Sequence, residues 1–323
     1  MSKSVILIIG ILVILLLSAL AFTILYKVGM SNAVFTFCFS RSDKEKWSRK
    51  CSNKNDRALS RMWDAGLDWA QENKEAKKEL EVVSGNTTLA AQYFDFGFEK
   101  AVIIIPGMFE TSMYSYYYAD VYKQAAFNCL LPDSRAHGLS EGSYFTAGDE
   151  EKKDIVEWAV LLHDRYGIKD IVLHGIAAGA AAAMLAVEGN DCPSYIKGIV
   201  SDGCYAKFED YFKNLLTVRK FGIKSYGSAM KKLFRYTGAT AEDGSPVNSA
   251  KDIDIPALFI IGKSDAYVPE KEALSLFDEY GKDCGNKAKQ KLVLENGTSE
   301  KLKFSDPEKY DAAICEFLDT LNL

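Results

Sequence analysis

Histidine and clustered cysteine are scarce in this 323-residue chain, and neither sign of charge is in strong excess. There are three histidines, none beyond His174, and the seven cysteines form no Cys-x-x-Cys pair. Without His/Cys clusters at metal-ligand spacing, the sequence predicts no metal site and no bound cofactor. The formal charge is -5, with acids and bases interspersed. This pattern offers no extended basic surface, which sets nucleic-acid binding aside.

One long apolar run is present at the N-terminus. It extends over residues 5–26, between Lys3 and Lys27, and is long enough to cross a hydrocarbon core of about 30 Å. A cleaved signal peptide is the alternative, because Ala19-Leu20-Ala21 resembles a cleavage site, although the apolar run continues past it. We therefore expect residues 1–30 to form a single transmembrane anchor.

The orientation of this anchor is open to two arguments. The basic residues that follow it favour a cytosolic body by the positive-inside rule. A very short N-terminal tail before a long apolar run is also typical of signal anchors with an exported body, and we expect an extracytoplasmic body. Cys38 and Cys51 could pair in an oxidising compartment. Residues 31–78, polar and helical in pattern, are predicted to connect the anchor to the body.

From residue 79 onward, short apolar runs alternate with helical stretches. Two β-prone runs around Gly85-Asn86 predict an antiparallel hairpin. Further strands are expected at 101–105, 127–131, 171–173, 198–201 and 257–261. Helices are expected at 113–126, 150–166 and 306–321. This alternation predicts a mostly parallel, doubly wound α/β sheet over 79–323, with any ligand crevice at one edge. A helical, aromatic insertion at about 205–254 is a candidate lid over that crevice, or a set of ordinary helices packed on the sheet.

The stretch from Ile171 to Val187 joins a β-branched run, the sequence His174-Gly-Ile-Ala-Ala-Gly179 and an alanine-rich run. It predicts a strand, a sharp elbow and a helix. Such an elbow holds its middle residue in a strained, exposed conformation suited to a nucleophile. The middle residue here is Ala177, so the geometry for a nucleophile is expected without the nucleophile.

Four stretches, taken in order, resemble the α/β-hydrolase superfamily, in particular bacterial membrane-anchored serine hydrolases of the esterase-like or serine-aminopeptidase-like kind. They are Ile105-Pro-Gly-Met108, the segment Pro132 to Gly142, the elbow, and Ile261-Gly-Lys-Ser-Asp265 with the following Ala-Tyr-Val-Pro269. The resemblance covers residues 79–323 and implies the α/β-hydrolase fold with a lid insertion.

The resemblance also assigns positions in the active site. The nucleophilic serine falls at Ala177, the acid at Asp265, and the oxyanion-hole amides at Met108 and Ala178. The family's histidine falls at about Ser299. The nucleophile and histidine positions are therefore both vacant.

A serine hydroxyl becomes a nucleophile only when a base takes its proton and a carboxylate orients that base. We therefore expect no triad-type hydrolysis, and instead binding of a small acyl-like ligand or of a protein partner of unknown identity. The alternatives are an active esterase-, lipase- or aminopeptidase-like enzyme whose serine is replaced at position 177, and a structural or adhesive module. A replaced serine alone would not explain the missing histidine.

No other residue offers a ready replacement. His137 is expected to brace a turn, His163 to lie on a helix and His174 to pack before the elbow. Cys204 lies at the same predicted sheet edge, but with no histidine expected nearby we interpret it as a buried thiol.

Overall fold

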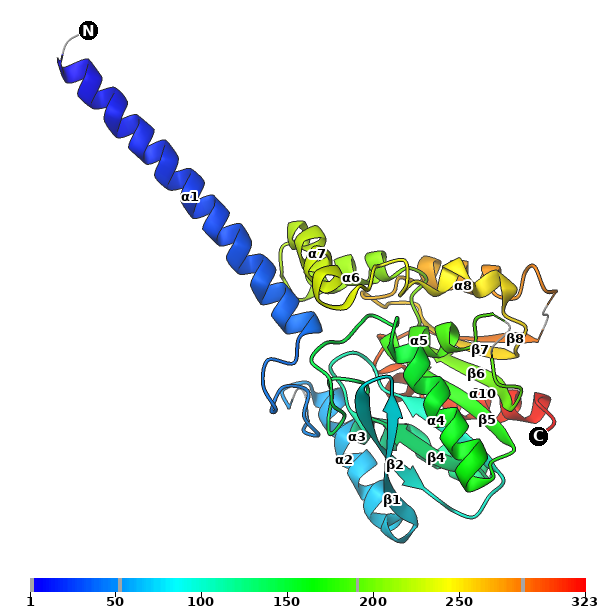
Figure 1. Cartoon of the computed structure of the whole chain (residues 1–323). Helices are drawn as coiled ribbons and strands as arrows, with labels where there is room; N and C mark the ends of the chain where they lie inside the picture. The colour runs from blue at the N-terminus through cyan, green and yellow to red at the C-terminus, as the bar shows by residue number, and fades with distance from the viewer. Residues whose placement is uncertain (1–2, 52–53, 190–191, 286–287) are drawn as a thin grey trace.

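The computed structural model describes residues 3–51, 54–189, 192–285 and 288–323 (Figure 1). Residues 1, 2, 52, 53, 190, 191, 286 and 287, which belong to the predicted anchor, connection and body, lie outside the described residues.

Helix α1 (Lys3–Phe39) begins the described chain and projects away from the body (Figure 1). Its apolar window has a mean hydropathy of 3.3 and none of it is buried, so the helix is long and apolar enough to cross a bilayer. The helix does not end near residue 30. Its last turns pack on the body, where Val34, Phe35 and Phe39 are buried.

Eight strands form one sheet in the order β1-β2-β4-β3-β5-β6-β7-β8. β2 is antiparallel to both of its neighbours, whereas the pairs from β4 to β8 are parallel. This confirms the predicted hairpin and mostly parallel sheet. The strands are β1 (Lys77–Ser84), β2 (Thr87–Phe94), β3 (Lys100–Ile105), β4 (Asn128–Pro132), β5 (Asp170–Ile176), β6 (Ile196–Asp202), β7 (Ala257–Gly262) and β8 (Lys289–Leu294).

Helices cover both faces of the sheet, which is why its strands have continuous apolar runs. Ile103 and Leu173 point into a core shared with α4 and α5, whereas Val102 and Val172 point into a core shared with α2, α3 and α10. The α-helices after α1 are α2 (Arg57–Glu72), α3 (Ser112–Gln124), α4 (Glu151–Tyr166), α5 (Ala178–Ala186), α6 (Phe208–Val218), α7 (Tyr226–Thr237), α8 (Glu270–Glu279), α9 (Leu302–Ser305) and α10 (Pro307–Thr320). The 3-10 helices are η1 (Lys74–Ala76), η2 (Ile223–Ser225), η3 (Pro246–Asn248) and η4 (Ala250–Asp252).

The predicted insertion lies between β6 and β7 and consists of α6, η2, α7, η3 and η4. We call the segment from Phe208 to Thr237 the lid. It contacts the end of α1 through aromatic rings: Phe35 lies 5.3 Å from Tyr236, and Phe39 lies 5.0 Å from Phe212, between ring centroids. Figure 1 shows α7 beside the point where α1 leaves the body.

Candidate functional site

The elbow between β5 and α5 has the geometry that the sequence predicts. Ala177 has φ 51° and ψ -111°, a conformation that is strained for a residue with a side chain. Glycine is required next to it, because a Cβ on Gly179 would lie 2.4 Å from the carbonyl oxygen of Ile105. The Ala177 methyl is buried at 1% exposure rather than exposed. The loop at Gly107 covers it: a Cβ built there would lie 3.8 Å from the Ala177 Cβ.

The acid position and the histidine position lie in direct contact. The Ser299 backbone N–H donates to Asp265 Oδ2 at 2.6 Å, and the Ser299 hydroxyl donates to the same oxygen. Asp265 Oδ1 accepts from the backbone N–H groups of Tyr267 at 2.8 Å and Val268 at 3.2 Å. Burial raises the pKa of Asp265, and these four hydrogen bonds oppose that shift. The residue at the predicted histidine position thus contacts the predicted acid, but serine has no basic nitrogen.

The two predicted oxyanion positions come from the elbow and from the loop after β3. Ala178 begins α5, so its backbone N–H is among the first four of the helix, which have no acceptor within it. Met108 follows β3 and is buried at 1% exposure. The structure thus places Ala177, Ala178, Asp265 and Ser299 at the same edge of the parallel sheet, beyond the carboxyl ends of β5, β7 and β8.

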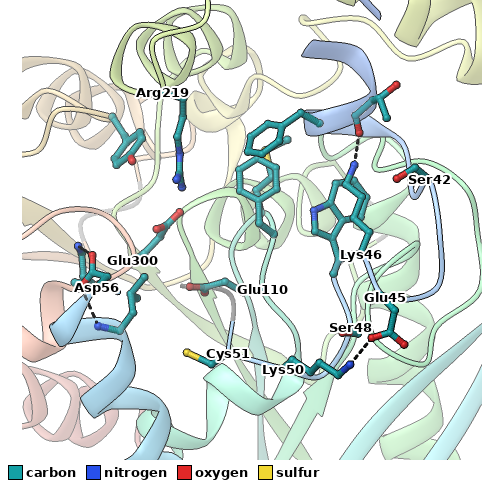
Figure 2. A pocket seen from close by; sticks show the side chains of 18 of the residues that line it. Ser42, Glu45, Lys46, Ser48, Lys50, Cys51, Asp56, Glu110, Arg219 and Glu300 are labelled. Atoms are coloured by element: carbon teal, nitrogen blue, oxygen red, sulfur yellow. Dashed lines mark hydrogen bonds and ion pairs between the residues drawn. The ribbon is translucent and has the colours of Figure 1, made fainter. Parts of the chain in front are cut away.

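A cavity of about 820 Å³ lies beside this edge, between the end of α1, the loop that follows it, the start of α2 and the lid (Figure 2). Met108 lines it, as do Tyr267 and Glu300, the near neighbours in sequence of Asp265 and Ser299. Its lining mixes apolar side chains, among them Phe37 and Phe109, with charged ones. The cavity therefore suits a molecule with both apolar and polar groups.

Two carboxyl groups face this cavity and were not predicted from the sequence. Burial, and then the charge of Glu300, raises the pKa of Glu110 well above its ordinary value. Burial raises the pKa of Glu300 to about 7, although Arg219 and Lys301 act against the shift. Arg219 lies across the cavity, and Figure 2 shows it and Glu300 pointing toward one another. The two carboxyl groups, Glu110 and Glu300, therefore together hold at least one proton near neutral pH.

The sequence did carry a signal for these carboxyl groups. Glu110 is two residues beyond Met108, and Glu300 directly follows Ser299. Carboxyl groups close in sequence to predicted site residues are candidates for the same site. That these two line one cavity can be known only from the three-dimensional structure.

The loop that follows α1 forms one wall of the cavity, and Lys46 of this loop is hydrogen-bonded to the end of α1. Lys46 donates from Nζ to the backbone carbonyls of Thr36 and Ser40 and lies 4.0 Å from the centre of the Trp47 ring. Burial lowers the pKa of Lys46 to about 8. The Trp47 ring stacks on His137 with 4.3 Å between centroids. His137 also contacts the Arg135 carbonyl through Nδ1 at 2.9 Å, in keeping with the expected bracing role.

His163 and Cys204 each contact a backbone carbonyl that lies outside the elbow. His163 Nδ1 is 2.8 Å from the Ile168 carbonyl. Cys204 is buried, which raises its thiol pKa and makes it a weak nucleophile. Cys38 and Cys51 are free thiols, so the disulfide considered above is not formed.

His174 belongs to a buried polar chain rather than to apolar packing alone. Its Nε2 is 3.0 Å from the Tyr310 hydroxyl, which donates to Asp202 Oδ2 at 2.5 Å, and its Nδ1 is 3.0 Å from the Tyr122 hydroxyl. Burial lowers the pKa of His174 to about 3 and raises that of Asp202 to about 7. His174 is therefore neutral and bonded to tyrosines at both ring nitrogens.

Comparison with known proteins agrees with this architecture. The family profile described as alpha/beta hydrolase fold matches residues 100–223. An uncharacterised protein of Bacillus subtilis, YqkD, is 26% identical over 236 residues, which is 69% of this chain and 72% of that protein. The Pyrococcus furiosus esterase Pf2001 superposes with a TM-score of 0.66 at 22% identity, over 78% of this chain and 93% of the esterase. The hydrolase GrgF from Penicillium gives a TM-score of 0.59 at 15% identity, over 76% and 98% of the two chains.

The strand order, the elbow and these likenesses define an α/β-hydrolase fold. The match to the family profile lies within residues 100–223, and the likeness to the solved structures is one of fold.

Proposed function

We propose that this protein is held in a membrane by α1, with its body on the extracytoplasmic side, and binds a small acyl-like ligand in the cavity without hydrolysing it by a triad mechanism. The observation that carries the proposal is the contact between Ser299 and Asp265. Asp265, at the position of the triad's acid, is hydrogen-bonded to Ser299, which cannot act as a base. Ala177, at the position of the nucleophile, has no proton to give.

The cavity supports ligand binding over a purely structural role. It is lined by Met108, at a predicted oxyanion position, and has the size of a small-molecule site. Phe37, Phe109 and Met108 supply apolar contact for an acyl chain. Glu110 and Glu300, when protonated, can donate hydrogen bonds to an acyl carbonyl, a polar interaction that does not require a nucleophile.

Binding can be tested with N-butylbutyramide, a water-soluble acyl analogue that has no labile ester. Saturation-transfer NMR with the full chain in detergent should show transfer to its methylene protons. Ala33 is an exposed residue of α1 that lines the cavity, so Ala33→Trp should fill the space and abolish the signal. Ala65→Trp, at an exposed position of α2 outside the cavity, makes the same change elsewhere and should leave the signal intact.

Equal signals from the two tryptophan variants would overturn binding in the cavity. Absence of hydrolysis is tested separately with a fluorophosphonate probe and nitrophenyl esters on the unaltered chain. Labelling that maps to any serine in the fold, with ester turnover to match, would overturn the proposal and favour an active hydrolase with unfamiliar groups.

A further inference from the structure

The lid exposes more apolar surface than the rest of the body. Outside α1, six large hydrophobic residues of the described chain are exposed, and four of them lie between residues 218 and 236. These four are Val218 at 39%, Ile223 at 51%, Phe234 at 60% and Tyr236 at 55% exposure. A concentration of exposed apolar side chains on one element indicates an interaction surface.

The same segment is basic in a protein that is acidic overall. From Tyr211 to Ala241 the sequence contains no aspartate or glutamate, although the whole chain has a net charge of -5. Its basic residues are Lys213, Arg219, Lys220, Lys224, Lys231, Lys232 and Arg235. Five of these seven are exposed, whereas Lys213 and Lys232 are half-buried and Lys213 pairs with Glu209. Exposed lysine and arginine interleaved with exposed aromatic and aliphatic side chains are typical of a surface that binds anionic lipid headgroups.

The position of the lid relative to α1 indicates that a lipid bilayer is the partner of this surface. Phe35, whose ring stacks on Tyr236, lies eight residues beyond Lys27, at the end of the apolar run. Eight residues of helix correspond to about 12 Å along its axis. The headgroup layer is about 5–7 Å thick on each side of the hydrocarbon core. If α1 spans a bilayer, α7 is therefore at or just outside the headgroups of the adjacent leaflet.

We propose that the exposed face of the lid, from Val218 to Tyr236, docks on the anionic phospholipid surface of the bilayer that α1 spans. The basic side chains contact lipid phosphates, while Ile223 and Phe234 enter the interface. This inference rests on the proposed anchoring of α1. It goes beyond the ligand site, although Arg219 belongs to both surfaces and places the cavity next to the membrane.

Quenching by brominated lipids tests the contact. The full chain carrying Phe234→Trp is reconstituted in nanodiscs of phosphatidylcholine alone or with phosphatidylglycerol, each with and without bromine on the acyl chains. The signal is the fluorescence of the Phe234→Trp chain minus that of the unaltered chain. In brominated discs with phosphatidylglycerol this difference should be mostly quenched. High salt should restore it. Tyr195→Trp, on the loop before β6 and at the opposite edge of the sheet, serves as the control and should not be quenched.

Charge reversal separates docking from anchoring. Lys224→Glu, Lys231→Glu and Arg235→Glu, added to Phe234→Trp, should abolish the quenching. A matched set outside the lid, Lys169→Glu, Lys271→Glu and Lys282→Glu, should leave it unchanged. Flotation with neutral liposomes reports on α1 alone. A chain that floats but shows no quenching in anionic discs, or equal quenching for both charge sets, would overturn lid docking. A chain that does not float would instead overturn the anchor.

Discussion

At the scale of single residues, Ala177 holds a backbone conformation that gives an alanine no evident benefit. Residues in such sparsely populated regions cost about 1–3 kcal/mol, and they persist because the surrounding structure dictates them. Here Gly175 and Gly179 hold strand and helix so close together that the turn between them has little alternative. The elbow is therefore fixed by the packing around it, and its middle side chain is a methyl group without a hydroxyl.

This interpretation predicts how the site responds when the missing groups are supplied. Ala177→Ser alone should remain unreactive toward a fluorophosphonate probe, because Ser299 offers no base. Ala177→Ser combined with Ser299→His places an imidazole within reach of Asp265 and should restore labelling. The increase over the single variant should be about 10²-fold or more, the usual contribution of general base catalysis. The rate of probe labelling, read by mass spectrometry, is the measurement.

Two controls define the result. Ser299→His alone should stay inert, because no nucleophile is present. Full reactivity of Ala177→Ser by itself would show that another group acts as base and that the chain is a hydrolase lacking only its serine.

Glu300 gives the cavity a predicted pH dependence. Burial raises its pKa to about 7, so the group is protonated below that pH and can donate to an acyl carbonyl. Affinity for N-butylbutyramide should fall about tenfold between about pH 6 and about pH 8, the loss of one hydrogen bond worth about 1.4 kcal/mol. Titration by NMR at both pH values measures this fall.

Glu300→Gln keeps a donor at the same position but removes the titration. Its affinity should be nearly the same at both pH values. An affinity of the unaltered protein that rises with pH would mean that the ionised carboxylate binds the probe, which would overturn the assigned donor role.

At the scale of elements, the sequence predicted most of the sheet because buried parallel strands are short, continuous apolar runs that stand out from their neighbours. The strands at 101–105, 127–131 and 257–261 agree with β3, β4 and β7 to within one residue. The turn at Gly85-Asn86 joins β1 to β2 because Gly85 adopts a φ of 60° there.

The end of α1 was less accessible to sequence reasoning. Hydropathy places the end of an anchor where the apolar run stops, near residue 30. The helix continues to Phe39 because its last turns are stabilised by contacts with the lid and with the loop residues Phe109 and Tyr144, which come from far along the chain. Sequence reasoning missed the two carboxyl groups for the same reason. Glu110 and Glu300 are 190 positions apart in the chain, and only the folded structure brings them to one cavity.

At the scale of the whole molecule, α1 divides into two parts along its length. Residues 3–28 are exposed and form a stretch that is long and apolar enough to cross a bilayer. Between residues 31 and 39, one face of the helix packs into the core of the body, where Val34 and Phe39 are fully buried. The anchor and the body are therefore joined by a rigid, packed segment, which fixes the direction in which the cavity faces relative to α1.

Truncation at two points tests this division. A chain that begins at Gly29 should unfold at nearly the same temperature as the full chain, because residues 3–28 are exposed and bury no side chain in the body. A chain that begins at Arg41 should lose several kcal/mol of unfolding free energy, since fully burying a valine or phenylalanine stabilises by about 1.5–3 kcal/mol. It should also bind an apolar dye through the uncovered core. Equal thermal stability of the two truncated chains would show that the end of α1 is a removable tether, and would leave the cavity without its α1 wall in the folded protein.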